Sequence, residues 1–474
     1  MKVLLINPYI QNCGGYYGGT VYPPLGLLYI AASLKKGGHS AKVLDAVILR
    51  LADDGLIELI REQTPDMIGL TVNIMTVKGC KLLAVKLRAT FPGIKIVCGG
   101  PMPTLEPEDW LDYGDVVVRG EGELAATAVC DCYEDNRMEE LRDIPGISYW
   151  QDGRKEHNPR QELILDLDAL PFPDYKDLYP ALDYYNKVRV GSRKVPVLPV
   201  YTSRGCPFGC IFCDKTVHGS KFRMRSPGNV MEEIRQLYRV HGAKQVDVLD
   251  DNFSSDVPRA EAILDLVIAE RMPLLFTIRS GIRVDKVTPG LVAKMKQAKF
   301  FKVAVGVETG DEAMMKRMKK GLALDKVKPV IRMFRDAGIN VHAFFMVGLP
   351  GDTPETMEKT IAFAKEANPH IANFSIALPL PGTELYAYVR KEGKFLVDIN
   401  TKDGISVGIS SGCGFFEDPV TRAEDVVRYY KKAYRSFYLR PGKIADILLH
   451  MDSFGEILWI MRGVKDLFRS VFSK

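Results

Sequence analysis

The stretch TSRGCPFGCIFC, residues 202–213, holds three cysteines in the spacing C-x3-C-x2-C: Cys206, Cys210 and Cys213. A cubane iron–sulfur cluster has four irons, and cysteine thiolates are its usual protein ligands. Three closely spaced thiolates on one loop can reach three of those irons and leave the fourth without a protein ligand. The spacing therefore predicts a 4Fe-4S cluster with one iron open to another molecule.

Two other uses of cysteine compete with this interpretation. A structural zinc site needs a fourth ligand, commonly from a second Cys or His pair about a dozen or more residues away, and only His218 is close in the sequence. A redox CxxC formed by Cys210 and Cys213 would leave Cys206 unused and belongs before a helix of a thioredoxin-like unit. The triplet favours the cluster over both.

The residues from the triplet onward alternate between strand-like and helix-like stretches. Apolar runs typical of buried strands cover 200–202, 245–249, 274–278, 302–307, 341–347 and 371–377. Each run except the last is followed by a stretch of helical periodicity, at 230–241, 259–270, 289–298, 326–337 and 354–367. This rhythm predicts parallel strands covered by helices. We expect a partial (β/α)6, TIM-like barrel over residues 196–390.

The first 150 residues show the same alternation. Strands are expected at 3–7, 41–44, 67–72, 94–98 and 116–118, and helices at 25–36, 51–63 and 77–91. The pattern predicts an α/β, Rossmann-like layer over residues 1–150, with ligands at the carboxyl ends of its strands. Prolines without regular periodicity predict a linker over residues 151–195. Residues 391–474 are expected to form a helical C-terminal region.

Acidic and glycine-rich motifs follow the expected barrel strands, and together with the triplet they resemble the radical S-adenosylmethionine (SAM) superfamily. In that family SAM binds the open iron of the cluster. The resemblance implies that SAM contacts Phe212, Asp250, Asp251, Arg283, Glu308, Met346 and Val347. Structural uses compete with these roles, because the two aspartates also suit a helix cap and the glycines and prolines nearby suit turns.

An α/β layer placed before such a barrel resembles the cobalamin-binding subgroup of this superfamily. The resemblance implies a cobalamin site formed by Tyr22, Pro24, Asp45, Thr71, Asn73, Gly99, Gly100, Pro101, Gly120, Glu121 and Gly122. The D-x-H-x-x-G signature of other cobalamin proteins is absent, because Asp45 is followed by Ala46, Val47 and Ile48. This departure implies cobalt without a protein imidazole ligand. Cys13 and Cys413, in glycine-rich loops, are candidates for hydrogen-atom donation or cobalt ligation.

The resemblance also implies a reaction. One electron from a reducing partner such as flavodoxin or ferredoxin would cleave SAM to the 5'-deoxyadenosyl radical, which would abstract hydrogen from an unactivated C–H bond. Cobalamin-dependent methyl transfer would follow. The alternative is a cobalamin-free cyclase, dehydratase or carbon–carbon coupling enzyme, acting on a small or lipid-like substrate. A third interpretation is a non-catalytic iron–sulfur or zinc scaffold.

Composition limits the partners and the location. The 64 Lys and Arg nearly balance the 59 Asp and Glu, so charge does not indicate a nucleic-acid partner. Nine cysteines with three crowded together suit a reducing, cytoplasmic setting. No run of eighteen apolar residues predicts a membrane span. Residues 444–472 repeat apolar side chains at helical spacing, with basic residues near the end. This pattern fits a peripheral contact with the inner membrane face, or a helix packed on the barrel or on a second subunit.

Overall fold

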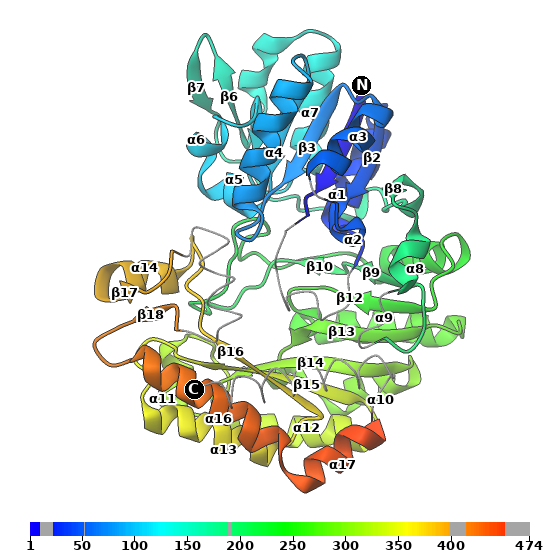
Figure 1. The fold of residues 1–474 in the computed structure, drawn as a ribbon. Coiled ribbons are helices and arrows are strands. Elements are labelled where there is room, and N and C mark those ends of the chain that lie inside the picture. The colour runs from blue at the N-terminus through cyan, green and yellow to red at the C-terminus, as the bar shows by residue number, and fades with distance from the viewer. Residues whose placement is uncertain (10–21, 52, 188–191, 399–413, 451–474) are drawn as a thin grey trace.

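The computed structural model describes residues 1–9, 22–51, 53–187, 192–398 and 414–450. Figure 1 shows two α/β units, the N-terminal one in blue to cyan above a second one in green to yellow. C-terminal helices in orange pack against the second unit. The α/β fold class expected from the sequence is confirmed.

The N-terminal unit is built on an eight-stranded sheet in the order β7-β6-β5-β4-β3-β1-β2-β8. Its strands are β1 (Lys2–Asn7), β2 (Ser40–Asp45), β3 (Met67–Thr71), β4 (Lys95–Gly99), β5 (Val116–Val118), β6 (Ile147–Gln151), β7 (Arg154–His157) and β8 (Leu178–Tyr179). Neighbouring strands pair in parallel except where β6 meets β5 and β7. Val3 to Ile6 are all buried, as expected for a parallel strand that is covered on both faces.

Helices cover both faces of this sheet. They are α1 (Leu25–Lys36), α2 (Ala46–Leu49), α3 (Asp53–Gln63), α4 (Val77–Thr90), α5 (Pro101–Leu105), α6 (Pro107–Trp110) and α7 (Glu123–Glu134). Leu28 of α1 and Val129 of α7 belong to one apolar core, whereas Ile60 of α3 and Leu83 of α4 belong to another. The first core continues into the second unit, so the two units share buried apolar surface.

The segment 151–195, expected as a linker, contributes strands to the sheet. β6 crosses residue 150, β7 lies beyond it, and β8 pairs in parallel with β2 through Leu178 opposite Val43. The reason is that β2 would otherwise expose a row of unpaired backbone groups at the sheet edge. The described residues between these strands form short 3-10 turns at Leu167–Ala169, Tyr175–Asp177 and, after β8, Leu182–Lys187.

The second unit is a six-stranded parallel sheet in the order β16-β15-β14-β13-β12-β9, consistent with the expected partial barrel. Its strands are β9 (Val197–Val200), β12 (Gln245–Val248), β13 (Leu275–Ile282), β14 (Phe300–Glu308), β15 (Asn340–Val347) and β16 (Ile371–Ile376). Its helices are α8 (Pro227–Arg239), α9 (Val257–Glu270), α10 (Pro289–Gln297), α11 (Glu312–Arg317), α12 (Val327–Asp336) and α13 (Pro354–Ala367). The first strand was expected at 200–202 and ends earlier, because Thr202 and Ser203 turn to bond a carboxylate at the end of β12.

The two faces of the barrel sheet differ in polarity. Side chains such as Val246, Ile278, Val303 and Val341 are buried in the core beneath the helices. The register of the strands puts polar residues on the other face, and they include Asp247, Thr277, Arg279, Lys302 and His342. Barrels with a packed lumen carry bulky branched residues there. The polar lining therefore suits a lumen that receives polar groups.

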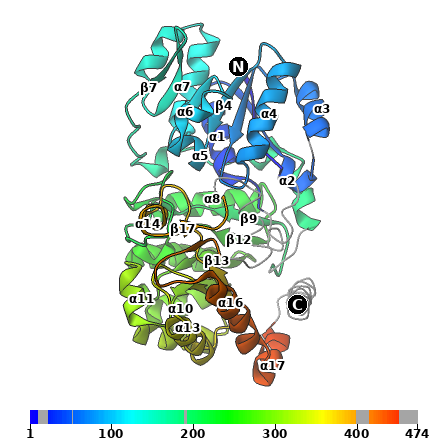
Figure 2. The same cartoon turned by 60° about the vertical axis from the view of Figure 1, so that its left-hand side comes forward.

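The C-terminal region packs partly at the open end of the barrel, where Leu385 contacts Ile211 of the cysteine loop, and partly on the outside of the barrel. It includes α14 (Glu384–Glu392), the strand pair β17 (Lys394–Phe395) and β18 (Phe416–Glu417), α16 (Ala423–Tyr438) and α17 (Pro441–His450). Figure 2 shows α16 running down beside α13, and Phe437 of α16 is fully buried against the sheet. Among the described helices, none has the length and apolar character that a membrane span requires.

Candidate active site

The three cysteines lie on a loop at the carboxyl end of the barrel, between two short antiparallel strands, β10 (Ser203–Arg204) and β11 (Arg223–Met224). Cys206 and Cys210 are partly exposed and Cys213 is exposed. Gly205 has a positive φ of 80°, and a Cβ there would meet the Lys221 carbonyl oxygen at 2.3 Å. Only glycine fits this position, so the residue before the first cysteine is fixed by the loop itself.

Lys320 and Arg283 carry positive charge close to Cys210. The neighbouring Cys213 thiol and the Lys320 charge hold the pKa of Cys210 below its ordinary value despite partial burial. Arg283 acts in the same direction. Its guanidinium carbon lies 3.5 Å from the centre of the Phe208 ring within the loop. Cations near a thiol favour the thiolate, which is the form that binds iron.

The donor set fits a cubane cluster. Three free thiols share one loop, and soft thiolate ligands suit iron–sulfur clusters. The neighbouring cations would balance the negative charge of three thiolates. When bound, such a cluster supplies the electron that cleaves SAM.

Asp250, at the end of β12, anchors the base of this loop. Its carboxylate accepts hydrogen bonds from the Thr202 backbone N–H at 2.6 Å, from the Thr202 hydroxyl, and from the Ser203 hydroxyl at 2.6 Å. The side chain is fully buried, and burial raises the pKa of this carboxyl. Asp251 is exposed and accepts from the Gly205 N–H at 2.8 Å. The two aspartates, expected to meet SAM, thus hold the loop that carries the cysteines.

Glu308, at the end of β14, is buried beside the cysteines. It pairs with Lys320 at 2.7 Å, and this contact outweighs burial and raises the pKa of Lys320. Glu308 has a φ of 71°, at an irregularity in the pairing of β14 with β15. Left-handed backbone in a residue other than glycine costs about 1 kcal/mol or more and is concentrated at functional sites. Arg283 donates to the carbonyl oxygens of Lys320 and Gly321 at 2.8 and 2.9 Å.

Phe212 and Met346 contribute to one apolar cluster above the barrel, with Ile211 and Met75. Val347, the next residue of β15, has its side chain on the opposite side, in contact with α13 and α16. Its carbonyl oxygen accepts from the Ala377 N–H at 3.0 Å. The main chain of β15 is therefore tied to the segment that follows β16.

Part of the expected cobalamin site forms an open edge. Gly120 has a φ of 91°, and a Cβ there would meet nothing within 4 Å. The Thr104 hydroxyl ties Gly120 to Gly100, because it accepts from the Gly120 N–H at 2.9 Å and donates to the Gly100 carbonyl at 2.8 Å. Thr71 ends the neighbouring strand β3. Small residues at the ends of β3, β4 and β5 fit a large flat ligand such as cobalamin.

The other expected cobalamin contacts have mainly structural partners. Gly100 is required by packing, since a Cβ would meet the Val72 carbonyl at 2.8 Å, whereas a Cβ on Gly122 would meet only the end of the Ile30 side chain at 2.9 Å. Pro24 precedes α1 and Pro101 begins α5. Asn73 stabilises the turn that precedes α4 by accepting from the Met75 N–H at 2.9 Å, and Gly99 pairs with Val118 in the sheet.

Three further polar residues of the expected cobalamin site are bonded within the protein. Asp45 is fully buried, caps α2, and accepts from Asn7 at 2.8 Å and from the Tyr185 hydroxyl. Tyr22 donates to Asp247 on the inner face of the barrel. Glu121 forms ion pairs with Arg204 at 2.9 Å and Arg223 at 2.7 Å. Cys13 and Cys413 lie outside the described residues.

The structure also brings forward residues that the sequence did not single out. Arg204, Arg223 and Arg225 flank the cysteine loop and are buried, and Lys320 completes the pair with Glu308. The sequence offered two signals of these roles. Arg204 stands two residues before Cys206, and one residue separates Arg223 from Arg225. Neither signal identifies the partners. Those of Arg204 and Arg223 lie far away in the sequence, in the N-terminal unit, whereas Arg225 pairs with the nearby Glu233.

Comparisons with known proteins agree with this site. Residues 200–364 match the Radical SAM superfamily and residues 17–130 match the B12 binding domain. The uncharacterized methyltransferase PH0819 of Pyrococcus horikoshii is 31% identical over 460 residues, which cover 95% of each chain. The anaerobic magnesium-protoporphyrin IX monomethyl ester cyclase of Rubrivivax gelatinosus is 27% identical over 81% of this chain and 69% of its own.

A solved structure shares the fold. The radical SAM methyltransferase TsrM of Kitasatospora setae, with cobalamin and a [4Fe-4S] cluster bound, superposes with a TM-score of 0.69 at 17% identity, over 93% of this chain and 90% of its own. This chain belongs to the radical SAM superfamily, in its cobalamin-binding subgroup. It is an enzyme whose cofactors are a 4Fe-4S cluster, SAM and cobalamin.

Proposed function

We propose that this chain transfers a methyl group from SAM, by way of cobalamin, to an unactivated carbon of a small molecule. The observation that carries the proposal is the position of the cysteine loop, which faces the carboxyl ends of both sheets. Met75, in the loop after β3, lies in one apolar cluster with Ile211 and Phe212 of the cysteine loop. This contact supports a shared space between the cluster and the open edge formed by Gly120 and Thr104, which we call the cobalamin edge.

The residues around this space suit radical chemistry. The lumen below the cysteines is lined by polar side chains, among them Arg279 and His342. Burial, with Lys302 and Arg279 nearby, keeps the pKa of His342 well below its ordinary value. A neutral imidazole can donate or accept a hydrogen bond to a substrate. Phe212 and Met346 supply the apolar cover that keeps water from the open end.

The residues around this space have different roles in the proposed reaction. Cys206, Cys210 and Cys213 would hold the cluster, and Glu308, Lys320 and Arg283 would surround SAM at the carboxyl ends of β13 and β14. Gly120 and Thr104 would line one side of cobalamin. The substrate would enter between the two edges, above the polar lumen.

The test uses protein purified without oxygen and supplied with iron, sulfide and hydroxocobalamin. After desalting, we expect a retained corrin spectrum and a brown cluster absorbance. With SAM and dithionite we expect 5'-deoxyadenosine, and with reduced cobalamin we expect S-adenosylhomocysteine even before a substrate is known. The second product separates methyl transfer from the alternative of a cobalamin-free cyclase, for which 5'-deoxyadenosine would appear alone. Absence of both products would overturn radical chemistry altogether.

Two finer features belong to the same proposal. The electron would come from a flavodoxin or ferredoxin. Formation of 5'-deoxyadenosine when either protein, in its reduced form, replaces dithionite would test this source. A peripheral membrane contact, or a lipid-like substrate, is supported by Ile444 and Leu449 of α17, which are 47% and 80% exposed. The expected helix continues into residues 451–474, outside the described residues. We expect the protein to sediment with anionic phospholipid vesicles and the Leu449→Glu variant to remain in the supernatant.

A further inference from the structure

The cysteine loop is clamped to the N-terminal unit by buried ion pairs. Arg204 precedes the loop on β10 and binds Glu121 at 2.9 Å and Glu123 at 2.5 Å. Arg223 follows the loop on β11 and binds the other oxygen of Glu121 at 2.7 Å. Each of these four side chains is 5% exposed or less. Both ends of the loop are thus attached to one short segment of the N-terminal unit.

This segment adjoins the edge at which we propose that cobalamin binds. Glu121 lies next to Gly120, which has open space above it, and Glu123 begins α7. Glu121 also accepts from the Ile164 N–H at 2.9 Å, and His218 of the cysteine loop lies 3.3 Å from its Oε1 atom. The hydrogen bonds from His218 and Arg223, with the Arg204 charge, overcome burial and hold the pKa of Glu121 well below its usual range.

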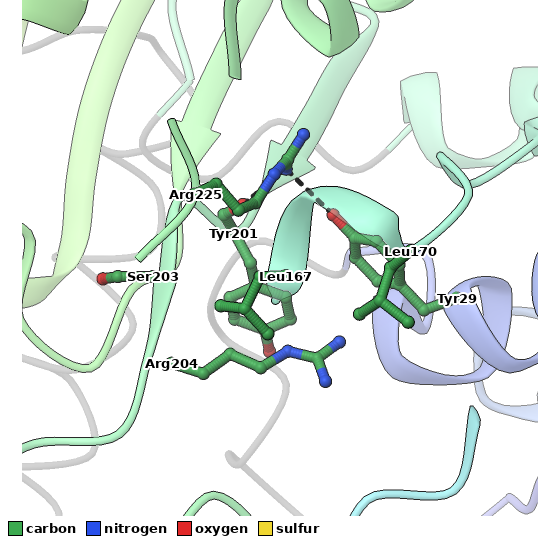
Figure 3. Close-up of a pocket in the computed structure, with 7 residues that line it drawn as sticks. All are labelled: Tyr29, Leu167, Leu170, Tyr201, Ser203, Arg204 and Arg225. Atoms are coloured by element: carbon green, nitrogen blue, oxygen red, sulfur yellow. Dashed lines mark hydrogen bonds between the residues drawn. The ribbon is translucent and has the colours of Figure 1, made fainter. Parts of the chain in front are cut away.

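A second attachment lies on the other side of the hairpin. Arg225, just after β11, donates to the Tyr29 hydroxyl of α1 at 3.1 Å, and Tyr29 in turn donates to Glu233 at 3.2 Å. Figure 3 shows Arg225 and Arg204 reaching toward Tyr29 around a small pocket between the two units. The Arg204 guanidinium carbon lies 5.3 Å from the centre of the Tyr29 ring.

The geometry of these contacts favours a positioning role. A buried ion pair is weak evidence for stability, because desolvation offsets much of the attraction. Its clearer advantage is directional, since the planar guanidinium fixes the carboxylates to which it bonds. Here one guanidinium joins two carboxylates that flank Gly122, and one carboxylate joins both strands of the hairpin. Such an arrangement determines where the cysteine loop lies relative to the cobalamin edge.

We propose that Glu121, Glu123, Arg204 and Arg223, together with the Arg225–Tyr29 contact, are positioning residues that set the distance between the iron–sulfur cluster and cobalamin. The inference rests on the proposed function, because it requires both cofactors in one chain. Removing one of these ion pairs by substitution leaves the cysteines and the open edge at Gly120 in place. Both cofactors still bind, whereas their separation becomes variable.

The test measures that separation without a substrate. Reduced cluster and cob(II)alamin each carry an unpaired electron, so electron paramagnetic resonance of the doubly loaded protein reports their magnetic interaction, which weakens steeply with distance. We expect a resolved splitting in the wild type and its loss in Glu123→Gln, with iron and corrin content unchanged. Glu134→Gln, at the exposed end of the same helix, is the matched control and should keep the splitting.

A second variant covers the case in which Glu123→Gln fails to fold. Tyr29→Phe removes only the hydroxyl that Arg225 contacts and should broaden the splitting. An unchanged splitting in every variant that folds, Tyr29→Phe included, would overturn the inference and leave the proposed function intact. A wild type that retains no corrin would instead overturn the proposed function, and the inference with it. In Arg204→Lys, which keeps the charge without the planar fork, we expect partial recovery relative to Arg204→Met.

Discussion

Lys320 Nζ lies 2.7 Å from Glu308 Oε1, and the two side chains are only 11% and 8% exposed. The pair sits beside the cysteine loop, where the Lys320 charge also acts on Cys210. A Cβ on Gly306 would meet both partners, at 2.6 Å from Glu308 and 2.9 Å from Lys320. Gly306, near the end of the fourth barrel strand β14, therefore leaves room for this pair.

Breaking the pair from one side should be costly. In Glu308→Gln the lysine charge stays buried without its partner, and we expect a loss of about 3 kcal/mol in the free energy of unfolding. Lys320→Met should behave similarly. The double variant should lose less than the two losses added together, which urea unfolding of all four proteins would measure. Simple additivity would mean that the two side chains do not depend on each other.

Asp250 should control cluster loading through the loop that it holds. Asp250→Asn replaces a carboxylate that accepts three hydrogen bonds with a group that has one acceptor oxygen. We expect a loss of about 2 kcal/mol in stability together with a clear fall in iron per chain after reconstitution. The control is Asp256→Ala, which removes the cap of α9. It should cost about 1 kcal/mol with full iron content, and low iron in both variants would assign the effect to general instability.

Substitution of a cysteine should affect either the cluster or the apolar core, depending on where the cysteine lies. Cys210→Ala should abolish the brown colour and SAM cleavage while the chain stays folded, because the side chain is partly exposed. Cys80→Ala should keep both properties and lower stability by about 1 kcal/mol, because it empties a fully buried site. Iron analysis and circular dichroism of the two variants would compare them. Retained iron in Cys210→Ala would contradict the assignment of the triplet.

Asp352 should make stability depend on pH in acid. It is 2% exposed, accepts from the Thr356 hydroxyl at 2.7 Å, and burial raises its pKa to about 6. The folded chain therefore holds a proton between pH 4 and 6 that the unfolded chain has lost, so this group stabilises the fold as the pH falls. Relative to Asp352→Asn, the wild type should gain about 2 kcal/mol between pH 7 and 4. A constant difference across this range would contradict the raised pKa.

The element order was largely predictable because each strand is a local apolar run. The helix at 25–36 and the strand at 116–118 have the expected bounds, and the six barrel strands appear within a few residues of their expected positions. Periodicity depends only on neighbours in the sequence, so it predicts such elements well. The cysteine triplet was recognisable for the same reason, since its three cysteines lie within eight residues of the sequence.

The partners of buried charges were not predictable. Glu121 looked like a ligand contact in the motif Gly120-Glu121-Gly122, yet it binds Arg204, 83 positions away. Asp45, also expected in the cobalamin site, accepts a hydrogen bond from Tyr185, 140 positions away. Long-range pairing depends on how the two units dock, and no local pattern records that docking.

The strand β8 has a practical consequence for anyone who wishes to study the cobalamin-binding half by itself. A fragment ending at residue 150 would lack β7 and β8 and would leave the outer edge of β2, from Val43 to Leu44, without its partner. Bare strand edges recruit other chains. Such a fragment should self-associate, and an isolated domain that stays monodisperse should have to carry the chain through Tyr179, almost to the first strand of the barrel.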